Sequence, residues 1–329
     1  MPHRLLSGRS VNALGFGAMC LSHAYGLIPT PEAGRKVLAA ALDLGAGHID
    51  TAALYGFGRN ETLVGEVLKG VRNQVFLASK CGVSTPEGAR EINGRPDRLR
   101  ATCEASLQRL QTDHIDLYYL HRWDKSVPIE ESVGALGDLV REGKIGSVGL
   151  SEVSAATLKK AHAEHPIAAV QTEYSLWTRN PEIAVLEACK DLGTAFVAFS
   201  PVGRGFLAGA VRDNQFVEGD FRRTMPRFNN DDNLARNLKW FAGFEELALR
   251  AGITPAQLSL AWVLSRGDHV HVIPGTRSVE HLTENMQTPL VSADILAEAE
   301  DIVSARSVAG GRYSAGSQAE VDTEEFEEA

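Results

Sequence analysis

Residues 115–150 read IDLYYLHRWDKSVPIEESVGALGDLVREGKIGSVGL, and this stretch contains one complete structural unit of the chain. Its first part, 115–120, is a short apolar run that is typical of a buried strand. The segment 129–142 has apolar residues at helical spacing, and Gly143 directly after it is a residue type that commonly ends a helix. A second apolar run follows at 147–150. The order strand, helix, strand predicts a parallel βα unit.

The same alternation continues along the whole chain. Eight short apolar runs predict strands, at residues 13–17, 48–51, 74–79, 115–120, 147–150, 169–172, 195–200 and 270–273. Amphipathic segments between them predict helices, among them 31–44, 97–110, 129–142, 154–163 and 255–265. Thr30-Pro31 and Thr254-Pro255 place a capping hydroxyl before a first-turn proline, and Gly45, Gly143 and Gly193 lie where helices are expected to end.

Eight such units without a change of composition favour a single (β/α)8 barrel over a doubly wound sheet with two domains. No G-x-G-x-x-G turn opens a helix after the first strand, which argues against the open sheet. We expect residues 1–313 to form the barrel. Residues 203–234 after the seventh strand include DFRRTMPRFNNDDN and are too long for an ordinary connection, so they predict a functional loop over one barrel mouth.

Composition and charge exclude several classes of protein. The chain has 329 residues, is 44% hydrophobic and 23% charged, and has a formal net charge of −9, as expected of a globular protein. Residues 314–329 contain six acidic residues and no Lys or Arg, so this tail is expected to be solvated and flexible, and the rest of the chain is close to neutral. No basic stripe is left for nucleic acid or for an anionic membrane.

No compartment signal is visible either. The N-terminus MPHRLLSGRS lacks the apolar core of a signal peptide, and no stretch has the roughly 18 apolar residues of a membrane span, which predicts a cytoplasmic protein. The four cysteines form no C-x-x-C pair, so neither structural zinc nor a disulfide framework is expected.

Four polar residues lie at or just after the ends of predicted strands, where a parallel barrel carries its active site. Asp50 closes HID, Tyr55 follows in AALYG, Lys80 closes FLASK and His121 closes DLYYLH. Taken singly, each could be a cap or a packing residue. Together they suit one mechanism, because an ammonium and an imidazole activate a phenol as a proton donor, and a buried lysine needs a carboxylate to stay charged. They predict Tyr55 as the general acid.

This set resembles the catalytic tetrad of the aldo-keto reductases. The resemblance extends over nearly the whole chain, through GFGAM, HIDTAALYG, LASKCG, DLYYLHRWD, GKIGSVGLSE, AAVQTEYSLWTR, VAFSPVGRGFLAG and VIPGTRSVEHLTEN. It implies a (β/α)8 TIM barrel and an NADP(H)-dependent oxidoreductase of the alcohol dehydrogenase or carbonyl reductase type, which reduces aldehydes or ketones. Segments such as SHAYG and EYSLWTR are similar to the branch that contains pyridoxal reductases and plant carbonyl reductases of the perakine type.

The resemblance also implies where the cofactor binds. Ser151 and Gln171 would hold the nicotinamide carboxamide, while Glu152 stands where many members have Asn and is given no role. Phe199 would stack on the nicotinamide. In PVGRG, the glycine N–H groups and Arg204 would meet the pyrophosphate. The predicted cofactor-binding residues in this part of the chain are Ser151, Gln171, Phe199, Ser200, Pro201, Gly203, Arg204 and Gly205.

PGTRSVEHLTEN follows the last strand and opens a helix, a place that attracts phosphate. Many relatives have Lys at the position of Gly275 and Arg at the position of His281, so Arg277 becomes the main partner of the adenosine 2′-phosphate, with the Arg222-Arg223 pair as the next candidate. NADP is therefore favoured over NAD. The predicted residues here are Gly275, Thr276, Arg277, Ser278, His281, Glu284 and Asn285, the last two toward the adenine.

Large aromatic residues in predicted loops, Tyr25, Trp123 and Trp177, would either line a pocket for an apolar carbonyl compound or pack within the loops. No H-E-x-x-H or G-x-S-x-G motif is present, so neither metal nor serine catalysis is expected. The alternatives are a nucleotide-sensing regulatory subunit with slow turnover and a barrel hydrolase, which would need a metal. The sequence indicates neither the substrate nor the oligomeric state.

Overall fold

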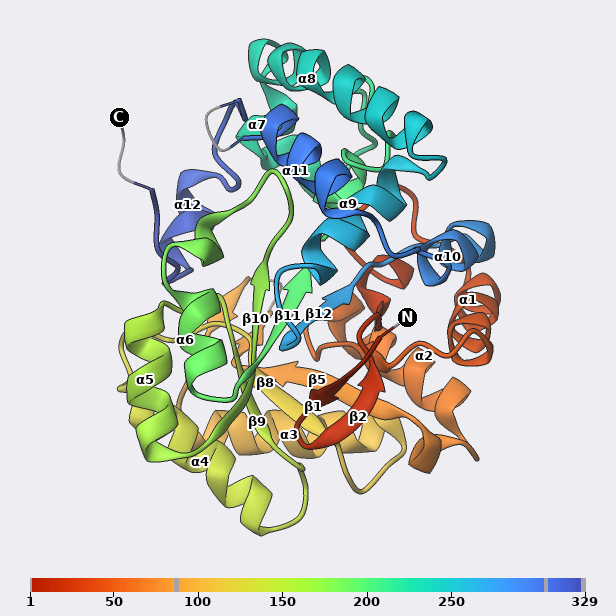
Figure 1. Cartoon of the computed structure of the whole chain (residues 1–329). Coiled ribbons are helices and arrows are strands. Elements are labelled where there is room, and N and C mark those ends of the chain that lie inside the picture. Colours follow the sequence, from red (N-terminus) through yellow and green to blue (C-terminus); the bar gives the residue numbers. More distant parts are fainter. Residues whose placement is uncertain (1, 86–88, 305–306, 327–329) are drawn as a thin grey trace.

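Eight parallel strands form one sheet with helices packed around it (Figure 1). The structure, a computed structural model, describes residues 2–85, 89–304 and 307–326. Neighbouring strands follow one another in chain order around the sheet. They are β3 (Phe16–Gly17), β4 (His48–Asp50), β5 (Phe76–Cys81), β8 (Leu117–Leu120), β9 (Val148–Ser151), β10 (Ile167–Glu173), β11 (Ala195–Phe199) and β12 (Val270–Ile273).

The segment before β3 closes the sheet into a barrel. The N–H of Gly15 donates to the carbonyl of Val272 at 2.9 Å, and the N–H of Val272 donates to the carbonyl of Ala13 at 2.9 Å. Leu14 and Val272 form a parallel bridge between these bonds. The last strand is thereby joined to the first, and the predicted (β/α)8 barrel is confirmed.

The helices match the segments expected from the sequence closely. Thr30 accepts a hydrogen bond from the N–H of Ala33 at the start of α1, and Thr254 and Gln257 form a capping box at the start of α9. The helices are α1 (Pro31–Asp43), α2 (Arg59–Leu68), α3 (Pro96–Leu110), α4 (Ile129–Arg141), α5 (Ala155–Glu164), α6 (Val185–Asp191), α7 (Pro226–Asn229), α8 (Asp231–Arg250), α9 (Pro255–Leu264), α10 (Val279–Met286), α11 (Ala293–Ile302) and α12 (Ala315–Ala319).

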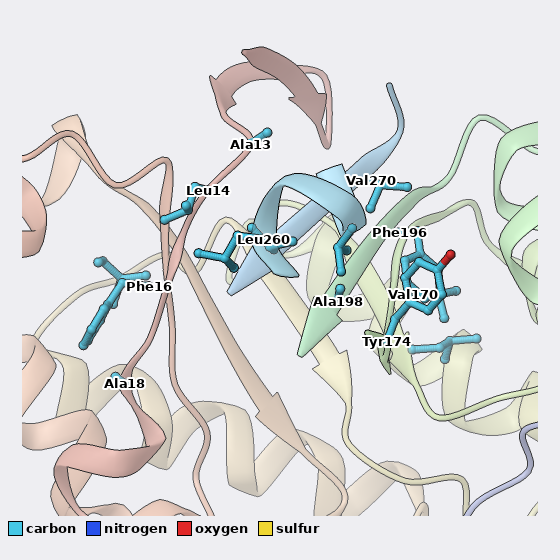
Figure 2. Packing of buried hydrophobic residues seen from close by; sticks show 14 of the residues in the cluster. Ala13, Leu14, Phe16, Ala18, Val170, Tyr174, Phe196, Ala198, Leu260 and Val270 are labelled. Atoms are coloured by element: carbon cyan, nitrogen blue, oxygen red, sulfur yellow. The ribbon is translucent and has the colours of Figure 1, made fainter. Parts of the chain in front are cut away.

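Two apolar layers hold the barrel together. Successive residues of a strand point to opposite faces, so Tyr118 joins the layer between strands and helices while Tyr119 joins the layer inside the barrel. Figure 2 shows part of the outer layer, where Phe16 of β3, Phe196 of β11 and Leu260 of α9 belong to one cluster. The strand ends are thereby fixed by packing on both sides, which gives a rigid frame to any side chains that they carry.

An N-terminal hairpin that the sequence pattern did not indicate covers the amino ends of the strands. β1 (His3–Leu6) pairs with β2 (Arg9–Asn12) in antiparallel register. Leu6 is fully buried and belongs to the inner layer. The Arg4 guanidinium donates to the carbonyls of Leu264 at 2.7 Å and of Val270 at the beginning of β12. The hairpin therefore closes one end of the barrel and leaves the carboxyl end open.

The long connection after β11 spans residues 200–230 and contains the short helix α7. It lies against the connection between β3 and α1, because the Phe221 N–H donates to the Ala24 carbonyl at 2.8 Å and the Asp220 carboxylate accepts from the Gly26 N–H at 2.7 Å. Helix α8 begins at Asp231, inside the stretch that we expected to be a loop. These contacts place the connection at the carboxyl ends of β3 and β11.

The acidic tail contacts the barrel as far as it is described. The Asp322 carboxylate accepts from the Ser154 hydroxyl at 2.9 Å, and Glu324 accepts from the Ala155 N–H at 2.7 Å, so both acids lie at the N-terminus of α5. Negative charge is favourable there. The described part of the tail thus makes defined contacts with the barrel, while its flexibility stays a prediction and residues 327–329 lie outside the described residues.

Within the described residues, no single helix has both the length and the apolar composition of a membrane span. Helices α8 and α9 reach these criteria only when taken together, and they meet at an angle of 87°.

The N-terminal hairpin, which closes one end of the barrel, yields a prediction about stability. Leu6→Ala removes a fully buried side chain and leaves a cavity, so it should lower the free energy of unfolding by about 2–5 kcal/mol. Leu5→Ala is the matched control, because Leu5 lies on the same strand but is 66% exposed, and its loss should change stability by less than about 0.5 kcal/mol. Urea unfolding followed by circular dichroism measures both. Equal effects of the two substitutions on the free energy of unfolding would contradict the role of Leu6 in closing the barrel.

Candidate active site

The carboxyl ends of the strands surround a cavity of about 990 Å³. Residues at or after the ends of all eight barrel strands line it, from Gly17 at the end of β3 to Asn285 in α10. The long connection after β11 and the C-terminal segment contribute further wall residues, among them Phe221 and Tyr313. This is the end of the barrel at which a functional site is expected.

The four residues predicted to act together do meet at this cavity. The Lys80 ammonium donates to the Asp50 carboxylate, to the Thr51 carbonyl at 2.8 Å and to the Tyr55 hydroxyl at 3.2 Å. The His121 ring lies edge-on to the Tyr55 ring, with 5.8 Å between the centroids. Asp50, Tyr55 and His121 line the cavity, while Lys80 lies behind them with no exposed side-chain surface.

Charge on the lysine is maintained by its partners. Burial by itself lowers the pKa of Lys80, but attraction to Asp50 and Tyr55 outweighs it, and the pKa is raised from its ordinary value. Burial raises the pKa of Tyr55, and the Lys80 charge opposes this. At neutral pH the site therefore holds a protonated phenol in direct contact with an ammonium group.

His121 and a second histidine flank the phenol as neutral rings. Burial lowers the pKa of His121 well below its usual value, and the charges of Arg122 and Lys80 lower it further. His23 stacks against the Tyr55 ring, with 6.3 Å between centroids and 17° between planes, and burial lowers its pKa as well. His23 was missed from the sequence, although its loop, SHAYG, had been noted.

Gln171 has a role in the tetrad beyond the one expected. Its side-chain amide donates to Oδ2 of Asp50 at 2.7 Å, while Lys80 binds Oδ1. Both oxygens of the buried carboxylate are thereby satisfied. Gln171 and Ser151 line the cavity, as expected of residues that contact a bound molecule.

Most of the predicted cofactor residues line the same cavity: Ser151, Gln171, Phe199, Ser200, Pro201, Arg204, Gly205, Gly275, Thr276, Arg277, Ser278, His281, Glu284 and Asn285. A Cβ atom on Gly275 would lie 2.8 Å from the carbonyl oxygen of Gly17, so no side chain fits there without a backbone shift. Steric exclusion thus accounts for the glycine at this position.

The start of α10 and Arg277 form one end of the cavity. Ser278 caps the helix, since its hydroxyl accepts from the His281 N–H at 3.3 Å. The exposed Arg277 donates to the carbonyls of Tyr25 at 3.1 Å and of Leu27, and it forms no ion pair with any described residue. A helix N-terminus beside an unneutralised guanidinium is a favourable place for phosphate.

The glycine-rich turn after β11 makes several contacts within the protein. The Arg204 guanidinium is buried and donates to the Glu173 carboxylate at 2.6 Å and to the Tyr25 hydroxyl at 2.7 Å. The N–H groups of Gly203 and Gly205 donate within the turn, at 2.9 and 3.1 Å, and Gly203 is absent from the described cavity wall. Arg204 and Gly205 nevertheless line the cavity, and the pyrophosphate contacts expected of this turn stay a prediction.

Two of the three aromatic residues proposed to bind substrate are also corrected. Trp177 is 2% exposed and stacks on Phe206, with 4.5 Å between ring centroids, so it is a core residue. Trp123 donates to the Val127 carbonyl at 2.9 Å and packs against the core. Neither is among the described residues of the cavity wall, whereas Tyr25 is.

Residues from the C-terminal segment, which no motif marked, complete the cavity wall. Tyr313, Ser317 and Glu320 line it, and Glu320 accepts a bidentate hydrogen bond from Arg90 at 2.8–3.0 Å across the rim. Such partners lie too far apart in sequence for a local pattern to indicate them.

Glu152, which had no assigned role, forms a buried ion pair with Arg312. Its Oε1 accepts from the Glu173 N–H at 2.9 Å, and its own carbonyl accepts from the Asp322 N–H at 2.9 Å. Its backbone has a φ of 57°, in the left-handed region. Glu152 therefore fixes the C-terminal segment to the end of β9, next to Ser151.

Within the part of the chain that the structure describes, no three His, Cys, Asp or Glu side chains are grouped so as to hold a metal ion.

Comparison with known proteins agrees with this geometry. The model of the aldo/keto reductase family matches residues 13–300. The protein named aldo-keto reductase yakc [NADP(+)] from Schizosaccharomyces pombe is 42% identical over 98% of both chains, and a probable aldo-keto reductase 1 from Glycine max is 43% identical over 93% of this chain and 89% of its own.

Solved structures show the same architecture. A glycerol dehydrogenase from Gluconobacter oxydans matches with a TM-score of 0.83 and 28% identity, over 94% of this chain and 97% of its own. An aldo/keto reductase from Klebsiella pneumoniae, solved with NADP and acetate, matches with a TM-score of 0.71 and 29% identity, over 92% and 96% of the two chains. With a matched family model, close relatives and a shared barrel, this chain belongs to the aldo/keto reductase family.

Proposed function

We propose that the protein is an NADP(H)-dependent carbonyl reductase that converts aldehydes or ketones to alcohols, with Tyr55 as the general acid. The contact between the Lys80 ammonium and the Tyr55 hydroxyl, at 3.2 Å, supports this proposal most directly. A phenol beside a permanent positive charge can release its proton to a substrate oxygen, because the resulting phenolate is stabilised at once.

The residues of the cavity suit a nicotinamide dinucleotide. Ser151 and Phe199, at the ends of β9 and β11, would hold the nicotinamide ring near Tyr55. Arg277 and the start of α10 would hold the adenosine 2′-phosphate. Gly17 and Gly275 also line the cavity, and neither position has room for a side chain. When bound, the reduced cofactor supplies the hydride.

The chain's own residues would handle the proton. Tyr55 donates from its hydroxyl to the carbonyl oxygen as that oxygen gains negative charge, and Lys80 stabilises the phenolate that remains. His121 is neutral in the free protein, so it would contribute a hydrogen bond rather than a second positive charge. Asp50 and Gln171 position Lys80 and do not need to exchange protons.

Turnover separates this proposal from the alternative of a nucleotide-sensing protein with the same fold. The test follows the loss of NADPH absorbance with a panel of aldehydes and ketones at neutral pH. A reductase oxidises NADPH in proportion to the enzyme concentration, whereas a sensor would bind NADPH without steady-state turnover.

The role of Tyr55 can be tested by removing one oxygen atom. Tyr55→Phe keeps the ring that contacts His23 and His121 but cannot donate a proton, so turnover should fall by at least about 100-fold. NADPH binding should change little, because the hydroxyl is not needed to hold the cofactor. Steady-state kinetics and a fluorescence titration of NADPH measure the two effects. Turnover near that of the wild type would remove Tyr55 from this role.

The ion pair beneath Tyr55 can be tested through stability alone. Lys80→Met leaves Asp50 as a buried charge whose ionic partner is gone, so the free energy of unfolding should fall by about 3–5 kcal/mol. The double variant Asp50→Asn/Lys80→Met removes both charges and should recover most of this loss. Urea unfolding of the three proteins makes the comparison. A single variant as stable as the wild type would show that Lys80 is not the group that compensates Asp50.

Cofactor choice can be tested at Arg277. Arg277→Ala removes a charge-assisted contact to the 2′-phosphate and should weaken NADPH binding by about 10- to 150-fold, while NADH, which lacks that phosphate, should bind almost unchanged. The dependence of NADPH binding on salt should also fall. Fluorescence quenching titrations with both cofactors at low and high salt measure these effects.

Arg236→Ala is the matched control. Arg236 is exposed on α8, away from the cavity, and its substitution changes the net charge by the same amount. Equal weakening of NADPH and NADH by Arg277→Ala would mean that Arg277 supports the fold or the adenine pocket. An unchanged affinity for NADPH would move the phosphate site to the Arg222-Arg223 pair.

A further inference from the structure

Arg122 carries a charge beside the tetrad that no described acidic group neutralises. It directly follows His121 at the end of β8 and lines the cavity. Its Nη1 donates to the His121 carbonyl at 2.6 Å and to the Ser151 hydroxyl at 3.3 Å, both of which are uncharged. Its Nε is buried and has no hydrogen-bond partner among the described residues. The protein alone therefore leaves this guanidinium incompletely satisfied.

Three other arginines of the cavity wall do have carboxylate partners. Arg90 pairs with Glu320 at 2.8 Å, Arg204 with Glu173 at 2.6 Å, and Arg222 with Asp220 at 2.7 Å. Lys80, behind the wall, is neutralised by Asp50. Among the described residues, the cationic side chains at the cavity that form no ion pair are thus Arg122 and Arg277.

These two arginines lie on opposite sides of the barrel mouth. Arg277 follows β12, whereas Arg122 follows β8, and the two strands are four positions apart in a ring of eight. One anion of the cofactor, the 2′-phosphate, is already assigned to Arg277 in the proposed function. Arg122 lies beside His121 and Ser151, where the reacting carbonyl compound would meet the tetrad. Its charge therefore lies where the reacting carbonyl compound would meet both the tetrad and the nicotinamide.

A partly buried guanidinium without a counter-ion is unfavourable, and the cost falls when an anion binds to it. The planar fork of arginine matches a carboxylate or a phosphate, and such hydrogen bonds are among the strongest in proteins. The Arg122 charge also reaches the tetrad, since it is one of the causes that lower the pKa of His121. An anion held here would lie next to the reacting groups.

We propose that Arg122 forms an anion subsite for the substrate, so that the preferred substrates are aldehydes or ketones that carry a carboxylate or a phosphate group. This inference rests on the proposed carbonyl reduction and adds the chemical class of the substrate. Arg90 does not take this role, because Glu320 already neutralises it.

The test compares substrates that differ only in charge. 4-Carboxybenzaldehyde and its methyl ester form the carboxylate pair, and glyceraldehyde 3-phosphate and glyceraldehyde form the phosphate pair. The wild-type enzyme should have a kcat/KM at least about 10-fold higher for the charged member of one pair, and the pair that shows the preference identifies the anion. Arg122→Gln, which keeps amide donors for the His121 carbonyl, should lower kcat/KM for that charged substrate by about 10- to 150-fold.

For the neutral substrate of the same pair, kcat/KM should fall by less than about 3-fold in Arg122→Gln. Arg122→Lys should restore part of the preference for the charged substrate, because lysine restores the charge but not the planar fork of donors. Arg95→Gln is the matched control. Arg95 is exposed outside the cavity, and its substitution changes the net charge by the same amount as Arg122→Gln. A wild type without preference for either charged substrate would overturn the proposal. Equal losses on charged and neutral substrates, with a raised KM for NADPH, would also overturn it and assign Arg122 to the cofactor.

A protein that turns over none of these compounds would refute the proposed function instead. Calorimetric titration of 4-carboxybenzaldehyde and its ester into the NADPH-loaded protein then still tests the anion subsite. Tighter binding of the acid by the wild type, lost in Arg122→Gln and kept in Arg95→Gln, would support the subsite without catalysis. Equal binding of acid and ester would rule it out.

Discussion

Lys80 has no exposed side-chain surface, and its charge depends on a single carboxylate, that of Asp50. Burial alone favours the uncharged amine, so the ammonium that Tyr55 contacts exists only because strands β4 and β5 place the two side chains together. Gln171 on β10 holds the second oxygen of the carboxylate from across the mouth. The site thus needs three strand ends at fixed positions, which is what a closed barrel with packed inner and outer layers provides.

Further buried ion pairs extend this arrangement to the C-terminal segment. Glu173 at the end of β10 binds Arg204 from the long connection, and Glu152 after β9 binds Arg312. Each pair joins a strand end to a segment outside the eight strands. The long connection and the C-terminal segment therefore form part of the cavity wall, and they bring Tyr313 and Glu320 to its rim.

The sequence was informative where the determining signals are local. The tetrad follows strand ends that are visible as short apolar runs, and caps such as Thr254 lie next to the helices that they begin. It was uninformative where partners are distant: Asp322 bonds to Ser154, 168 positions away, and Trp177 stacks on a ring from another loop. The sequence did not predict the hairpin, because β1 buries only Leu6 fully and is too short for a clear alternation of apolar and polar residues. The branch of the family stays a prediction.

The same limit applies to the arginines of the cavity. Arg204 and Arg277 both follow a strand end in a glycine-containing loop, so the sequence treats them alike. In the fold, Arg204 meets Glu173 and becomes part of the wall, whereas Arg277 and Arg122 meet only uncharged partners among the described residues. Ion pairing between elements, rather than position in a motif, therefore separates the cations that hold the barrel mouth together from those whose charge is left for a ligand.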